Sequence, residues 1–223
     1  MASVWDVVEI KDYPEETKPI AGKEEKLGEL SSEDVEIFVR ELDVFIQQEM
    51  HPILRKVIIA NANNILDIIR TVQYETKAGF KGAYARGNEL TLVHIYPKLL
   101  GWSENTWLKT YSSTGATDWI GSSSSPINTG ERGGHIYLAL YDPVDVPKVG
   151  AIQLNKDGDN FVIETLNWYR HRNYYVPTYV LREPFLFPPR HTYYIRVRVD
   201  TTGDDKLQPL AFAVLEARNL MSL

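Results

Sequence analysis

The fold class follows first from one stretch, Tyr193-Tyr194-Ile195-Arg196-Val197-Arg198-Val199, in which apolar and polar side chains alternate. Successive side chains of a β-strand point to opposite faces, so the odd-numbered residues lie together and the two arginines lie on the other side. Alternation of this kind is typical of an antiparallel strand with one face on a core and one face in water. We therefore expect a half-buried strand over residues 193–199.

Further strand-like runs occur on both sides of this stretch. They are Leu90–Tyr96, Ile136–Tyr141, Val149–Leu154, Phe161–Leu166 and Leu210–Leu215. The Asp157-Gly158 dipeptide between two of these runs is a strong hairpin signal. Short strands at this density, without helical patterns between them, predict a mainly β domain over residues 74–223, an antiparallel sandwich or barrel.

The N-terminal third of the chain differs from the rest in composition and in the spacing of its apolar residues. Residues 1–30 contain eight acids and four lysines, are interrupted by two prolines, and are predicted to form an extended acidic arm. Residues 31–73 carry apolar side chains at helical spacing, with a break at His51-Pro52, and predict two amphipathic helices. Such helices need a partner surface for their apolar faces.

Composition excludes several functional classes. The net charge of −6 argues against a general nucleic-acid binder, and the absence of cysteine excludes disulfides, thiolate nucleophiles and zinc–thiolate sites. The first ten residues lack the pattern of a signal peptide, and no run is apolar enough to cross a membrane. We expect neither a signal-directed secreted protein nor a membrane-spanning one.

No motif predicts a catalytic residue, a metal ligand or a cofactor. Asn155, Asp157 and Asp159 have the spacing that opens a calcium loop, but the twelfth position is Leu166, so a turn is the better interpretation. The five histidines are dispersed. Convergence of Glu164, Glu183 and Glu216 into a glycosidase site stays open, without positive support from the sequence.

One stretch mixes aromatic residues with arginine. It contains Trp168, Tyr169, Arg170, Tyr174 and Tyr175. These side chains are candidates for a protein interface, for stacking on a glycan or nucleic acid, or for filling a sandwich core. A second apolar stretch, Glu183–Pro189, contains three prolines that exclude a central strand, and it adds Phe185 and Phe187 to the candidate interface set.

Residues 90–220 resemble viral single jelly-roll capsid proteins in strand density and turn chemistry, and the stretch Tyr179–Pro189 looks like the long connections of such coat proteins. The tyrosine-rich, cysteine-free chain is most similar to the vertex (penton-base or turret) proteins of turreted icosahedral viruses of archaea. The resemblance implies a jelly-roll sandwich and a structural, non-enzymatic virion protein. It implies assembly with copies of itself, a pentamer at a five-fold vertex, and with other capsid proteins.

The resemblance also implies that the helical arm docks onto neighbouring capsid components or an internal membrane-associated protein, with no direct contact to nucleic acid. Two other functions stay open at this stage. One is a carbohydrate-binding or receptor-binding β-sandwich that uses the aromatic side chains as a stacking platform. The other is a glycoside hydrolase built on a sandwich.

Overall fold

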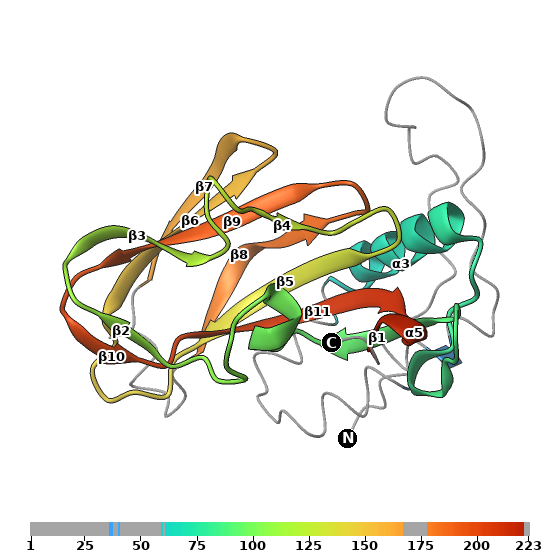
Figure 1. Ribbon diagram of the computed structural model, residues 1–223, viewed down its shortest axis with the longest axis horizontal. Coiled ribbons are helices and arrows are strands. Elements are labelled where there is room, and N and C mark those ends of the chain that lie inside the picture. The colour runs from blue at the N-terminus through green and yellow to red at the C-terminus, as the bar shows by residue number, and fades with distance from the viewer. Residues whose placement is uncertain (1–35, 38–39, 41–58, 60, 167–177, 221–223) are drawn as a thin grey trace.

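The computed structural model describes residues 36–37, 40, 59, 61–166 and 178–220. Within them the fold is mainly β, with antiparallel pairing between all the named strands, as the sequence predicts. Figure 1 shows two extended sheets, with helix α3 (Ala62–Thr76) near one end. The short helices are η3 (Gly82–Tyr84), η4 (Pro97–Leu100) and α5 (Ala217–Leu220).

Two sheets account for most of the strands. Sheet 1 contains, in spatial order, β1 (Leu90–His94), β11 (Gln208–Glu216), β5 (Gly134–Tyr141) and β8 (Thr178–Phe187). Sheet 2 contains β3 (Gly115–Ile120), β9 (Thr192–Val199), β6 (Val149–Lys156) and β7 (Asp159–Thr165), and β4 (Ile127–Asn128) also pairs with β9. A separate two-stranded ribbon joins β2 (Lys109–Tyr111) to β10 (Gly203–Asp205).

The strand pairings are nested along the chain. The pairs β6–β7, β5–β8, β3–β9 and β1–β11 enclose one another in sequence, as the rungs of one long hairpin would. Successive pairs belong alternately to sheet 2 and sheet 1. The chain therefore passes between the two sheets repeatedly, and most of the contacts that hold the sheets together join residues distant in sequence.

The core between the two sheets contains residues from both of them. Tyr193, Ile195, Val197 and Val199 of β9 are each at most 2% exposed and lie in one cluster with inward-facing residues of β5, β8 and β11. Their neighbours Arg196 and Arg198 remain accessible to solvent. The alternation predicted for residues 193–199 is confirmed, and sheet 2 has one buried and one polar face.

The turn between β6 and β7 also follows the sequence signal. Asp157 and Gly158 have φ values of 52° and 89°, and a two-residue hairpin turn of type I′ needs positive φ at both positions. Asn155 and Asp159 lie in the flanking strands, where they pair in the β6–β7 ladder. The turn interpretation of this segment is confirmed.

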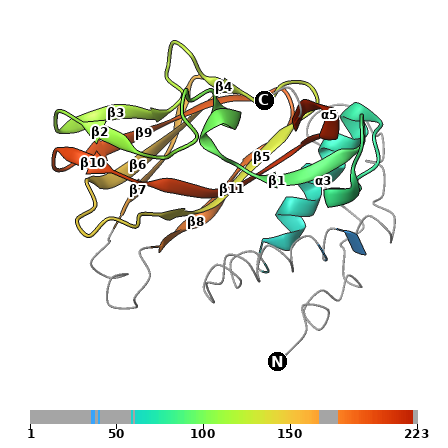
Figure 2. The same cartoon turned by 60° about the horizontal axis from the view of Figure 1, so that its bottom comes forward.

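Sheet 1 is buried on both faces. Ile136, Leu138, Phe212 and Val214 point away from sheet 2 and form a second cluster with the apolar side chains of α3. The helix lies so close to β5 that a Cβ atom on Gly134 would be 2.7 Å from Cγ2 of Ile68. Figure 2 shows α3 lying against sheet 1, where its main strand contacts are with β5, β11 and β8. The fold therefore has three layers: helix, sheet 1 and sheet 2.

Helix α3 coincides with the described part of the second predicted helix. Its stripe of Ile65, Ile68, Ile69 and Val72 is buried, as the helical spacing predicts. The helix continues to Thr76, through the predicted boundary at residue 73. The acidic arm, most of the first predicted helix and the start of the second lie outside the described residues. Among the described helices, none has both the length and the apolar character needed to span a membrane.

We expect Ile69→Ala to destabilise the whole fold, because this fully buried side chain joins α3 to sheet 1. The substitution should lower the free energy of unfolding by about 2–5 kcal/mol, as large-to-small changes in cores do. Urea unfolding followed by tryptophan fluorescence measures the change. Asn63→Ala, at an exposed position of the same helix, is the matched control and should change the value by at most about 0.5 kcal/mol. Equal stability of the two variants would contradict a structural role for α3.

Candidate functional site

The predicted interface set divides into two parts. Phe185 and Phe187 are 4% and 0% exposed and lie in the core between the sheets. Their rings fill that core and are not available to a partner, which removes both residues from the interface set. Trp168, Tyr169, Arg170, Tyr174 and Tyr175 lie outside the described residues, in the segment that joins β7 to β8. For these five residues the interface stays a prediction.

The proline-containing stretch forms part of β8, at the edge of sheet 1. The ladder with β5 shifts register here, because Tyr137 pairs with Phe185 while Ala139 pairs with Val180. Pro184 therefore sits in a bulge on an edge strand, where its missing N–H breaks no central ladder. The prediction that this stretch is not a central strand is confirmed, but most of Tyr179–Pro189 belongs to strand β8 and is not the long connection that the resemblance implied. The phenylalanines that looked available to a partner point inward because the strand alternates.

A buried polar network lies between the sheets and was not predicted. The Tyr193 hydroxyl is 2.6 Å from Nδ1 of His135 and 2.7 Å from the Tyr137 hydroxyl. The ring of Phe187 stacks on Tyr193 with a centroid separation of 3.9 Å. The three polar residues come from β5 and β9, so this network ties the two sheets together. Only the long-range pairing brings these residues together, so no local sequence pattern indicates the network.

Burial dominates the titration of this network. It lowers the pKa of His135 to about 4, because a charged imidazolium would be cut off from water. Burial likewise raises the pKa of Tyr137 and of Tyr193 far above the ordinary value for tyrosine. All three groups are neutral at pH 7. They form hydrogen bonds with one another and are too deeply buried for a substrate to reach. Their arrangement therefore indicates a structural role.

Of the three carboxylates considered for glycosidase chemistry, Glu183 and Glu216 do not form such a site together, and the side chain of Glu164, in β7, lies outside what the structure describes. Glu216 is fully buried and is held by Arg132 at 2.7 Å and Arg218 at 2.8 Å. Arg132 also donates to the carbonyl oxygen of Thr76 at the end of α3, so the cluster fixes a corner of the fold. Glu183 is exposed on the edge strand β8. Glu216 is buried and paired with two arginines, so it cannot contact the same sugar as the exposed Glu183.

A histidine–aspartate pair lies at the turn where β6 meets β7. His191 Nδ1 is 2.6 Å from Asp157 Oδ2, and the Thr192 amide donates to the other carboxylate oxygen. Burial alone raises the pKa of Asp157, but these hydrogen bonds and the nearby positive charges outweigh it and lower the pKa below the usual range. Among the described residues, no group of three or more histidine, aspartate or glutamate side chains is placed to bind a metal ion. The contacts join the β6–β7 turn to the start of β9.

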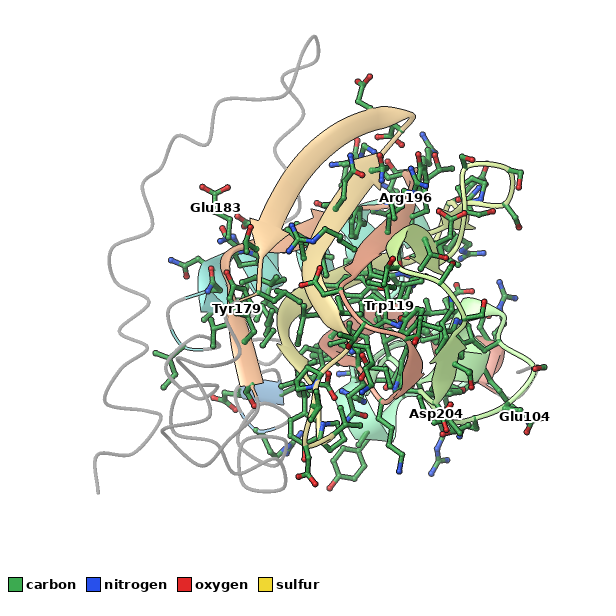
Figure 3. All side chains as sticks on the ribbon, turned by 90° about the vertical axis from the view of Figure 1, so that its left-hand side faces the viewer. Glu104, Trp119, Tyr179, Glu183, Arg196 and Asp204 are labelled. Carbon is green, nitrogen blue, oxygen red and sulfur yellow. The ribbon has the colours of Figure 1, made fainter. Side chains whose placement is uncertain are left out.

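A cluster of tryptophans that includes Trp119 of β3 was also not predicted. Trp107 contacts Trp102 and Trp119 at centroid distances of 5.2 and 6.1 Å. Lys109 reaches over this cluster to the carbonyl oxygen of Asp118, and burial lowers its pKa. Figure 3 shows Trp119 near the middle of the described side chains, with Glu183 projecting on the left-hand side. Trp107 and Trp119 are at most 8% exposed, so this cluster is an extension of the core.

Comparison with known proteins adds little. No protein-family model matches the sequence, and no curated protein matches it. One solved structure, dimeric latent PorU from Porphyromonas gingivalis, is similar to 63% of this chain at 16% identity, with a TM-score of 0.25. The match spans 13% of the PorU chain. A likeness of this size carries no argument about fold or function.

The buried histidine makes stability depend on pH. The pKa of His135 is about 4 in the folded protein and about 6.5 in the unfolded chain, so the unfolded chain binds more protons between these values. The contribution of neutral His135 to the free energy of unfolding is fully present above about pH 7. It is lost progressively as the pH drops from 6.5 toward 4. For His135 alone, the free energy of unfolding should decrease by about 2 kcal/mol between pH 7.5 and pH 5.

The measurement is urea unfolding at both pH values for the wild-type protein and for His135→Asn. The variant keeps a polar group near Tyr193 but does not titrate in this range, so its loss between pH 7.5 and pH 5 should be smaller by that amount. The difference between the two proteins isolates His135 from the other titrating groups. Identical pH dependence in both proteins would contradict a buried, neutral His135.

Proposed function

We propose that this protein is a structural virion protein, a capsid or vertex subunit whose body is a single jelly roll. The observation that carries the proposal is the nested strand pairing. A jelly roll is an eight-stranded, two-sheet fold made from two Greek keys. It can be drawn as one long antiparallel hairpin wrapped so that successive strand pairs alternate between two sheets. The order β1-β11-β5-β8 facing β3-β9-β6-β7 fits that scheme strand for strand.

Further support comes from the contacts of the buried polar side chains. The buried histidine, the two tyrosines and Glu216 are all bonded to other side chains of the fold, so these groups stabilise the interior. A protein of this kind acts through its surfaces. We propose that the chain forms homo-oligomers, as pentamers at a vertex, and that it is located in the virion. There it would contact other capsid proteins and an internal membrane-associated protein.

The segment between β7 and β8 is the best candidate for the contact between copies. Both flanking strands are edge strands, one in each sheet, and edge strands and their connections are common sites of association. The segment carries the aromatic and arginine residues of the remaining interface set. Tryptophan, tyrosine and arginine are the side chains that most often dominate binding energy at interfaces. The carbohydrate-binding alternative depends on the same segment.

We expect the purified protein to form a closed ring, with about five times the 25.5 kDa mass of one chain. Light scattering over a concentration series measures this mass. The double variant Trp168→Ser/Tyr169→Ser should weaken the ring by about 30-fold or more in dissociation constant, which is the effect of losing a hot spot of about 2 kcal/mol. Thermal unfolding should change little.

Tyr84→Ser is the matched control, because Tyr84 is 70% exposed and lies on η3, outside the proposed contact segment. The control should keep the ring mass of the wild-type protein. A strict monomer at every concentration would contradict self-assembly through this chain alone. A ring that survives the double variant unchanged would remove the β7–β8 segment as the contact.

A further inference from the structure

Two aspartates near the β2–β10 ribbon carry buried carboxylates. Asp142 directly follows β5 and is 0% exposed, and Asp205, the last residue of β10, is 1% exposed. Figure 1 shows the ribbon at the end of the sheets that lies away from α3. Neither aspartate belongs to the tyrosine–histidine network or to the Glu216 cluster. A buried charge is costly unless it is paired or bound to a metal ion, so the burial of these groups has to be offset by another interaction.

Main-chain amides hold both carboxylates in place. Oδ2 of Asp205 accepts a hydrogen bond from the Lys148 amide at 2.9 Å, and its Oδ1 accepts one from the amide of the residue that follows at 2.8 Å. Oδ1 of Asp142 accepts from the Val144 amide at 3.1 Å. The two aspartates thus hold the two ends of one connection, residues 142–148, which joins β5 to β6. A carboxylate has about four lone-pair sites, so each keeps acceptor capacity after these bonds.

The lysines beside Asp205 do not neutralise its charge. Lys109 lies directly opposite Asp205 in the ribbon, but its Nζ donates to the carbonyl oxygen of Asp118. Lys148 contacts Asp205 through its main-chain amide. Its side chain runs past Gly203, where an added Cβ atom would be 3.3 Å from Cε and 3.9 Å from Nζ. Within the part of the chain that the structure describes, Asp205 forms no ion pair.

A tyrosine hydroxyl lies near the two carboxylates and is bonded to neither. Tyr111 of β2 is 4% exposed, and its hydroxyl has no hydrogen-bond partner among the described residues. Tyr111 pairs with Gly203, so the alternation of the ribbon places it on the same face as Asp205. Burial, and then the charges of Asp205 and Asp142, raise the pKa of this hydroxyl. A buried hydroxyl without a partner beside two acceptors is the arrangement expected around a bound ion or water.

The donor set selects the kind of ion. Two carboxylates and a hydroxyl offer only oxygen atoms, which suit a hard cation. Calcium takes six to eight oxygen ligands in a flexible geometry, and these include main-chain carbonyl groups and water. Such groups would complete the coordination here, because the two carboxylates are fewer than the three acidic or histidine side chains of a larger metal cluster. A site with so few charges should bind calcium with a dissociation constant of about 10⁻⁴–10⁻³ M.

We propose that the carboxylates of Asp142 and Asp205 and the hydroxyl of Tyr111 form a binding site for a calcium ion. The ion binds the connection of residues 142–148 to the β2–β10 ribbon and fixes this end of the sheets. Its charge offsets the burial of two negative groups. The site uses none of the residues of the β7–β8 segment and rests on no part of the capsid proposal, so the two proposals can fail separately.

Thermal unfolding of the full chain, after removal of metal ions with a chelator, tests the site. Calcium chloride at about 10 mM should raise Tm by about 3–10 °C, because the ion then exceeds its dissociation constant by about 10–100-fold. Sodium chloride of equal ionic strength is the control and should change Tm by less than about 1 °C. An unchanged Tm in calcium chloride would overturn the proposal.

Three variants show whether these residues bind the ion. Asp205→Asn should lose the calcium-dependent rise in Tm, because the amide keeps the shape of the side chain without its charge. Asp204→Asn is the matched control and should keep the rise, because the Asp204 side chain is exposed and bonds to Thr110. An equal rise in both variants would overturn the proposal. Tyr111→Phe removes only the hydroxyl and should weaken calcium binding by about 10-fold, which gives a second test if Asp205→Asn fails to fold.

Terbium luminescence locates the ion independently of stability. Tb³⁺ binds at oxygen-rich calcium sites and emits when a nearby aromatic side chain absorbs light, and Tyr111 would be such a neighbour. Emission should appear when Tb³⁺ is added to the wild-type protein and should fall when calcium is added in excess. Asp205→Asn should lose this calcium-sensitive emission. Emission that is equal in Asp205→Asn would overturn the proposal, because the ion would then be bound by other acids, such as those of residues 1–30.

Discussion

Burial of both faces of sheet 1 is the constraint on which the rest of the structure depends. Strands β5 and β11 are buried along almost their whole length, and their side chains point alternately to sheet 2 and to α3. Antiparallel sheets commonly leave one face in water, and sheet 2 does so. Sheet 1 cannot, because both sides of its central strands are apolar. The helix layer is therefore part of the fold and not an attachment to it.

The outer faces of the two sheets consequently differ in character. The outer face of sheet 2 carries exposed ion pairs, such as Asp118 with Arg196 and Arg198 with Asp200, which stabilise little but keep that face in solvent. The outer face of sheet 1 is closed by packing. Between the sheets, the hydrogen bonds that Tyr193 shares with His135 and Tyr137 connect β9 to β5. A buried polar group needs these partners, so the network also specifies how the two sheets align.

Local sequence signals predict the local parts of this structure well. The alternation in β9, the Asp157-Gly158 turn and the apolar stripe of α3 each depend on residues within one or two turns or strands, and each is confirmed. Phe185 and Phe187 show where such signals stop. The nearby prolines correctly excluded a central strand, but only the pairing of β8 with β5 decides that the rings point into the core. Glu216 and the tyrosine network likewise depend on contacts between distant residues.

The pattern of burial also limits where this protein can make contacts. The space between the sheets is filled, the outer face of sheet 1 is packed against a helix, and Glu216 is closed off by two arginines. The described surface that remains includes the polar face of sheet 2, the edge strands and exposed positions outside the sheets such as Tyr84, Leu108 and Val146. β8 is blunted by its bulge and Pro184, which discourage simple strand addition along that stretch. Under the proposed function, side chains on the connections next to these edges would carry specificity, because they can be recognised without exposing a continuous strand to unintended pairing.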